Sequence, residues 1–229
     1  MLRGLQDKLC LLTEACKQCD NMEIKFSLSD IEAFEKQDRT NLINGLSGYK
    51  SAHLIGTKNV SGLNNLAIFS SVVHIGANPP LIGFVHRPAT VERHTYENIK
   101  ETGHFTINHV PIELYQQAHQ TSARYPRNES EFDACGFTEF YGEVLSAPYV
   151  LESPIKIGLT LEEEILVKSN QTIILIGKVQ EIYLAPEFIL ESGVLNLSAA
   201  RTLIVQGLET YYKSEKIGTL TYAKPNSTV

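Results

Sequence analysis

Short apolar segments bounded by turn residues run through the middle of the chain. Leu66 to Val73 and Leu81 to Val85 are strongly apolar and too short for independent helices, so they are predicted to be core strands. The Asn78-Pro79-Pro80 connection between them cannot continue a strand ladder, because proline lacks the amide donor, and it predicts a tight crossing. Further strands are expected at Ser51 to Thr57, Phe105 to Val110, Ile155 to Leu161 and Thr172 to Tyr183. The pattern predicts a mainly β fold with flanking helices.

The first part of the chain has a helical pattern instead. Six residues fall on one helical stripe, which could pack on the rest of the protein or pair with a partner helix: Leu2, Leu5, Leu9, Leu12, Cys16 and Cys19. Ser29-Asp30-Ile31-Glu32 is interpreted as a capping box that opens a second helix through about Lys36. We expect residues 1–47 to form a helical extension and residues 48–229 to form the main domain.

Two helices are predicted within the main domain. The first follows Arg87-Pro88, carries Tyr96 and Ile99 on its apolar side and ends at Gly103, which has the position of a left-handed cap. The second begins at Pro111 and leads through residues 113–120. The loop that follows, residues 124–133, is long and polar, and we interpret it as a possible lid over a binding site.

Polar groups gather at the start of the first of these helices. Arg93, Thr95 and Asn98 lie there, where free backbone amides and a partial positive charge suit a phosphate. Arg87 and Arg93 could add charge-assisted, forked hydrogen bonds to the same anion. The alternative is that both arginines are solvated loop residues and that Thr95 merely caps the helix.

Composition narrows the function classes. A chain of 229 residues can bury one sizeable core, and its formal charge of −6 disfavours a nucleic-acid or anionic-membrane partner. The amino terminus has neither a long apolar run nor a signal-peptide pattern, so a cytoplasmic location is expected, with cysteines that stay reduced. Cys16 and Cys19 have no second ligand pair at a zinc spacing, so no metal site is expected.

Several enzyme classes lack their motifs in this sequence. It contains no Gly-x-Gly-x-x-Gly, no phosphate loop ending in Gly-Lys-Ser/Thr, no Gly-x-Ser-x-Gly and no His-Glu-x-x-His. Rossmann dehydrogenases, P-loop enzymes, serine hydrolases and zincins are therefore disfavoured. Tryptophan is also absent, so any stacking on a planar ligand must come from Phe or Tyr.

An ordered series of short motifs resembles the flavin reductase-like family, whose fold is an FMN-binding split β-barrel. The series covers roughly residues 40–185 and consists of Asn65-Leu-Ala-x-Phe-Ser, Pro79-Pro-Leu-Ile-Gly-Phe, Arg87-Pro, Arg93-x-Thr-x-x-Asn-Ile, Gly103-x-Phe-x-Ile-Asn, Thr121-Ser-Ala-x-Tyr-Pro, Glu131-Phe-Asp-Ala-Cys-Gly-Phe and Ala147-Pro-Tyr-Val-Leu-Glu-Ser-Pro. No single motif is specific, but their order is. Many relatives carry lysine at the position of Arg93, so positive charge is kept there.

The resemblance implies a set of FMN-binding residues. The strand residues Asn65, Ala67, Phe69, Ser70 and Ser71 would contact the flavin, partly through backbone groups. Arg87, Arg93 and Thr95 would hold the phosphate, with Asn98 supporting the helix start and Thr121 and Ser122 approaching from the following loop. His86 could sit near the flavin edge or simply pack in the core. The resemblance also implies a homodimer, because the family's barrel uses a partner to complete the cofactor pocket.

Two function hypotheses follow from the resemblance, and a third requires no cofactor. The first is an oxidoreductase that transfers hydride from NADH or NADPH to FMN; no catalytic side chain is named, because the cofactor carries the reaction. The second is a flavoredoxin-like module that passes electrons to a redox partner protein without oxidising NAD(P)H. The third is an empty barrel retained for protein interaction. The segment 207–212 could reach across a dimer or form a surface tail.

Overall fold

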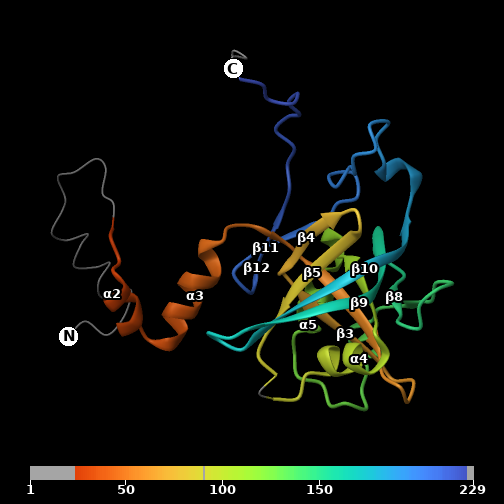
Figure 1. Ribbon diagram of the computed structural model, residues 1–229, viewed down its shortest axis with the longest axis horizontal. Helices are drawn as coiled ribbons and strands as arrows, with labels where there is room; N and C mark the ends of the chain where they lie inside the picture. The colour runs from red at the N-terminus through yellow and green to blue at the C-terminus, as the bar shows by residue number, and fades with distance from the viewer. Residues whose placement is uncertain (1–23, 90, 226–229) are drawn as a thin grey trace. The chain divides into compact units, whose positions relative to one another are not determined.

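The computed structural model describes residues 24–89 and 91–225 (Figure 1). Its elements up to the middle of the chain are α2 (Leu28–Ala33), α3 (Lys36–Leu46), β1 (Lys50–Ser51), β2 (His53–Lys58), β3 (Asn64–Phe69), β4 (Val72–Ala77), β5 (Pro80–His86), α4 (His94–Thr102) and β6 (His104–His109). The rest are η1 (Ile112–Leu114), α5 (Tyr115–Gln120), α6 (Glu131–Cys135), β7 (Glu139–Phe140), β8 (Tyr149–Val150), β9 (Ile155–Val167), β10 (Thr172–Leu184), η2 (Pro186–Phe188), β11 (Leu203–Gln206) and β12 (Thr210–Lys213). The chain divides into two compact units, residues 1–50 with 205–210, and residues 51–204 with 211–229.

The first unit contains the helices α2 and α3, and its capping box differs from the predicted one. Ser27 is the N-cap of α2: its hydroxyl accepts the Asp30 N–H at 3.3 Å, and the Asp30 carboxylate accepts the Ser27 N–H at 2.9 Å. The box therefore begins two residues before the predicted Ser29, and α2 ends at Ala33 because Phe34 turns to extended backbone. The predicted helical stripe of residues 2–19, with Cys16 and Cys19, lies outside the described residues.

The second unit is built on a seven-stranded antiparallel sheet with the order β3-β2-β6-β9-β10-β5-β4, and the predicted mainly β fold is confirmed. The predicted strand from Leu66 to Val73 is wrong as a single element. β3 ends at Phe69 and β4 begins at Val72, so the two halves lie at opposite ends of the strand order. Ser71 explains the break, since its hydroxyl donates to the Val85 carbonyl at 2.8 Å and accepts the Val85 N–H at 3.2 Å, which joins the chain to β5.

Most of the remaining predicted elements of the second unit lie close to their observed bounds, but β9, predicted to end at Leu161, continues to Val167. β4 and β5 form a hairpin across the predicted Asn78-Pro79 turn, with Ala77 opposite Pro80. α4 ends at Gly103, whose φ of 71° is the left-handed conformation that favours glycine. The helix predicted after Pro111 is η1 followed by α5, and the predicted loop 124–133 is shorter than expected because α6 begins at Glu131.

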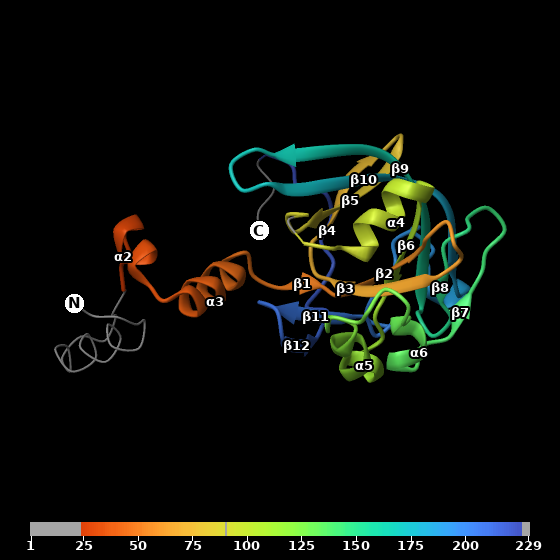
Figure 2. The ribbon, with the colours of Figure 1, turned by 90° about the horizontal axis from the view of Figure 1, so that it is seen from below.

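One apolar core holds the sheet and α4 together. Its fully or nearly buried members are Ile55, Phe84, Ile99, Phe105, Ile107, Leu159, Ile173 and Leu175. The Phe84 ring meets Phe105 at 5.7 Å and Phe69 at 5.0 Å, both edge-on. α4 covers one side of the sheet through Ile99, while α5 and α6 lie on the other side of β3 (Figure 2). β3 is thus flanked by helices on two sides, so side chains from α4, α5 and α6 can reach it.

The segment 207–212, predicted to reach across a dimer or to form a surface tail, is divided between the units, and Tyr211 and Tyr212 belong to the second. Tyr211 packs against α5, where its ring lies 5.9 Å from Tyr115 and its hydroxyl lies 2.9 Å from His119 Nδ1. Further on, Ile217, Leu220 and Tyr222 are at least 90% exposed. Within residues 24–89 and 91–225, no helix is long and apolar enough to cross a membrane.

Candidate functional site

β3 carries most of the residues predicted to contact a flavin. Asn65, Ala67 and Phe69 are on the same face of the strand, because side chains alternate along it. Asn65 is buried, Ala67 and Phe69 are half-buried, and Ser70 follows the strand. The Ser71 hydroxyl is already used by the Val85 backbone, so this residue shapes the chain where the two strands separate.

The start of α4 is tied to two strands by polar side chains. Asn65 Nδ2 donates to Thr95 Oγ1 at 3.1 Å, which links β3 to the first turn of the helix. Asn98 Nδ2 donates to Thr57 Oγ1 at 3.1 Å, which links the helix to β2. All four residues are buried, and a buried amide without such a partner would be destabilising. Asn98 therefore holds α4 against β2, and Thr95 is fixed beside Asn65.

Three arginines gather at the start of α4 without an acidic partner. Arg93 is the N-cap residue of the helix, and its buried Nε has no hydrogen-bond partner among the described residues. Burial, and then the positive charges of Arg87 and Arg124, lower the pKa of Arg93. None of the three forms an ion pair within the described part of the chain. Like charges held together next to a helix N-terminus form a ready site for an anion.

Arg124 was missed by the sequence reasoning. It follows Thr121 and Ser122 by a few residues in the same loop, and that proximity was the only signal for it. Thr121 itself is buried and donates its hydroxyl to the Ala118 carbonyl at 2.8 Å, while Ser122 is exposed. This loop therefore approaches Arg93 through Arg124. No described contact joins Thr121 or Ser122 to Arg87 or Arg93.

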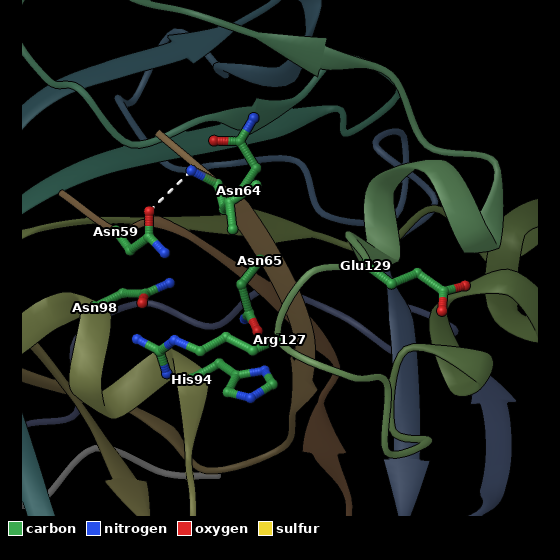
Figure 3. Close-up of a pocket in the computed structure, with 8 residues that line it drawn as sticks. Asn59, Asn64, Asn65, His94, Asn98, Arg127 and Glu129 are labelled. Atoms are coloured by element: carbon green, nitrogen blue, oxygen red, sulfur yellow. Dashed lines mark hydrogen bonds between the residues drawn. The ribbon is translucent and has the colours of Figure 1, made fainter. Parts of the chain in front are cut away.

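Arg127 is surrounded by carboxylates, in contrast to the three arginines. Its guanidinium contacts Glu97 closely and lies 3.6 Å from Glu92 and 3.9 Å from Glu101. Glu97 also accepts the backbone N–H of Arg93 at 2.9 Å. Figure 3 shows Arg127 between α4 and β3, with the side chain of Glu129 pointing away from it. Arg127 therefore connects the loop before α6 to α4. Its charge is balanced by these carboxylates, so it is a poor candidate for binding an anionic ligand.

His86 lies between β3 and α4. Its ring is 6.1 Å from Phe69 and 5.4 Å from Tyr96, and its Nδ1 lies 2.7 Å from the Arg87 carbonyl. Burial lowers the pKa of His86, and the charges of Arg93 and Arg87 lower it further, against the opposing effect of the Arg87 carbonyl. A neutral imidazole in this aromatic setting suits packing as well as the edge of a planar ligand, so both interpretations of His86 remain.

Glu131 is a second residue that the sequence did not reveal. It is 5% exposed, and its Oε2 accepts the backbone N–H of Leu66, in the middle of β3, at 2.9 Å. Burial raises the pKa of Glu131, which the Leu66 N–H partly opposes. An acidic residue in the first turn of a helix is ordinarily a solvated one, and for that reason the motif alone did not mark it.

Arg87, Arg93 and Arg124 line neither of two spaces between elements in the described part of the chain. The narrow space between α4 and the β2–β3 hairpin, lined by Asn65, His94, Asn98 and Arg127 among others, measures about 10 Å³. That volume has room for a single water molecule. A larger groove of about 480 Å³ lies over β10 and η2, and shares no lining residue with it.

Comparison with known proteins agrees with this geometry. The family described as flavin reductase like domain matches residues 49–198. The structure of a candidate flavin reductase with a split barrel domain from Shewanella frigidimarina is 45% identical and covers 88% of this chain and 100% of its own, with a TM-score of 0.84. A flavoredoxin of Desulfovibrio vulgaris is 25% identical and covers 78% and 92%, with a TM-score of 0.65. An uncharacterized protein of Halalkalibacterium halodurans is 27% identical over 169 residues, 71% of this chain and 81% of that protein. The chain has the split-barrel fold and belongs to the flavin reductase-like family.

Proposed function

We propose that the protein binds FMN and is an oxidoreductase that reduces the flavin with NADH or NADPH. The observation that carries this proposal is the group of Arg87, Arg93 and Arg124, which has no acidic partner and includes a buried, unpartnered Nε. A phosphomonoester would neutralise these charges and supply that hydrogen bond. The residues present therefore fit the phosphate end of FMN.

The rest of the proposed site follows from β3 and its neighbours. Asn65, Ala67, Phe69 and Ser70 line the strand along which the flavin would lie, and the Asn65–Thr95 hydrogen bond fixes that strand against the helix that holds the phosphate. His86 lies at the end of β5 beside Phe69. Ser71 and Asn98 would act indirectly, through the positions of Val85 and α4, and Thr121 and Ser122 through Arg124.

The bound cofactor would supply the hydride chemistry, accepting a hydride from reduced nicotinamide. The protein's own part is then to bind, orient and keep water from one face of the ring, so no side-chain acid or base is assigned. We place this activity in the cytoplasm.

We also propose that the protein works as a homodimer. Val85, Ile174 and Ile165 lie opposite one another on neighbouring strands, so they form one apolar row on the outer face of β5, β10 and β9. Val85 is 38% exposed and Ile165 is 41% exposed. An outer sheet face is ordinarily polar, and a row of exposed apolar residues there suits a contact with a second copy. A partner placed there could also help to enclose the flavin site.

A second candidate function is a flavoredoxin-like electron carrier that uses a redox partner protein and does not oxidise NAD(P)H. The likeness to the Desulfovibrio flavoredoxin favours it, whereas the higher identity to the Shewanella candidate reductase favours the enzyme. Both candidates need the same flavin site, so the site residues cannot separate them.

An absorption spectrum separates the two candidates. The purified protein is mixed with FMN, passed through gel filtration and then given NADH or NADPH without oxygen. We expect retained flavin bands that bleach within seconds. Bands that persist with both nucleotides would favour the electron carrier, and a protein that retains no FMN would refute flavin binding itself.

A further inference from the structure

β3 has one free edge. It is the end strand of the seven-stranded sheet, and among the described residues only its β2 side is paired with another strand. The backbone groups on the free edge need other partners, because unpaired amides and carbonyls are costly when buried. Leu66 is fully buried, and its N–H is held by the Glu131 carboxylate at 2.9 Å.

In an antiparallel strand, the backbone N–H and carbonyl groups of successive residues point alternately to the two edges, and this alternation identifies the next groups that face the free edge of β3. Backbone groups that face one edge recur at every second residue, about 7 Å apart. Because the Leu66 N–H faces the free edge, the N–H and carbonyl of Ile68 face it too, while Ala67 is directed to Ile55 of β2. Ile68 lies between Ala67 and Phe69, both of which we assign to the flavin site.

A rigid local structure holds the Glu131 carboxylate in place. Ser130 caps α6 by accepting the Phe132 N–H at 3.3 Å, and Phe132 is fully buried. Packing alone does not call for a carboxylate at this position, since a buried charge costs free energy that an apolar side chain would avoid. A carboxyl group buried at such a cost, with its oxygen on a backbone amide of β3, suggests a role in the site.

We propose that Glu131 is a positioning residue of the flavin site: it occupies the Leu66 amide, fixes the free edge of β3, and leaves the backbone N–H and carbonyl of Ile68 as the hydrogen-bonding groups offered to the flavin ring. This inference rests on the proposed function. Glu131 acts through the strand, and the contact with the cofactor is made by the backbone of Ile68.

Two variants of similar volume test the hydrogen bond. Glu131→Gln keeps an acceptor oxygen for the Leu66 N–H, and Glu131→Met fills the same space without one. Asp133→Asn, an exposed acidic residue of the same helix, is the control for charge. FMN affinity is measured by fluorescence titration, and amide exchange of Leu66 and Ile68 is measured by NMR in the flavin-free protein.

We expect Glu131→Met to weaken FMN binding about tenfold and to speed exchange of the Leu66 amide by at least as much. Glu131→Gln should restore most of both losses, and Asp133→Asn should match the wild type. Wild-type affinity in Glu131→Met, or equal losses in the Met and Gln variants, would overturn the inference while leaving flavin binding intact. A wild-type protein that does not bind FMN would overturn the proposed function, and this inference with it.

Discussion

Arg93 and Arg127 are the same residue type close to the same helix, and their neighbours give them opposite roles. Arg127 is surrounded by Glu92, Glu97 and Glu101, so its charge is already balanced. The charges that act on the guanidinium of Arg93 are those of Arg87 and Arg124, which lower its pKa after burial has done so. The difference depends on residues from the following loop and from the strand before the helix, so spacing within the helix alone could not reveal it.

Replacing two of the three arginines tests whether they bind the phosphate of FMN together. We expect Arg87→Ala combined with Arg93→Ala to weaken FMN binding at least tenfold, because each hydrogen bond between a charged group and phosphate contributes about 1.5–3 kcal/mol. The dissociation constant from a fluorescence titration checks this. Arg201→Ala is the control, since Arg201 is exposed and paired with Glu113 away from the site. Equal FMN affinity in the double variant and the control would refute the phosphate site.

At the scale of elements, β2 and β6 face each other through a buried histidine, His53, and a half-buried one, His109. The rings of His53 and His109 lie 4.6 Å apart and edge-on, and the Nδ1 atoms of both have no partner among the described residues. Burial lowers the pKa of His109 from 6.5 to about 4, and it lowers the pKa of His53 well below its ordinary value, with His109 adding to the effect. The pair is therefore neutral in the folded protein at neutral pH.

This pair should make the protein sensitive to mild acid. Above pH 6.5 neither the folded nor the unfolded state takes up a proton at His109. Below that pH the unfolded state does so first, so stability falls as pH decreases towards 4, by about 2 kcal/mol at pH 5. His109→Leu removes this titration and should make the fall in urea-unfolding stability between pH 7 and 5 shallower, while His53 still contributes a fall of its own. The exposed His74→Leu is the control, and an equally steep decline in the His109 variant would contradict the prediction.

Elements with a strong local pattern were predictable, and those set by distant contacts were not. Gly103 ends α4 through its left-handed backbone, a local preference that can be seen in sequence. The break between β3 and β4 depends on a bond from Ser71 to Val85, a distant residue, so one apolar run appeared as one strand. Glu131 was hidden for the same reason, because its burial depends on β3. The candidate site was predictable in its residue types through family resemblance, and its indirect contacts required the fold.

At the scale of the whole molecule, flavin binding and assembly should depend on each other. We expect a dimer by light scattering, and Ile165→Glu should shift it towards monomer because it places a charge in the apolar row with Ile174 and Val85. If the partner encloses the flavin, the same variant should weaken FMN binding, since a ligand that binds only the dimer stabilises it by mass action. Val144→Glu, an exposed apolar residue outside the row, is the control. A wild-type monomer that holds FMN would refute the dimer proposal, and an Ile165→Glu monomer with unchanged FMN affinity would show that one protomer forms the whole site.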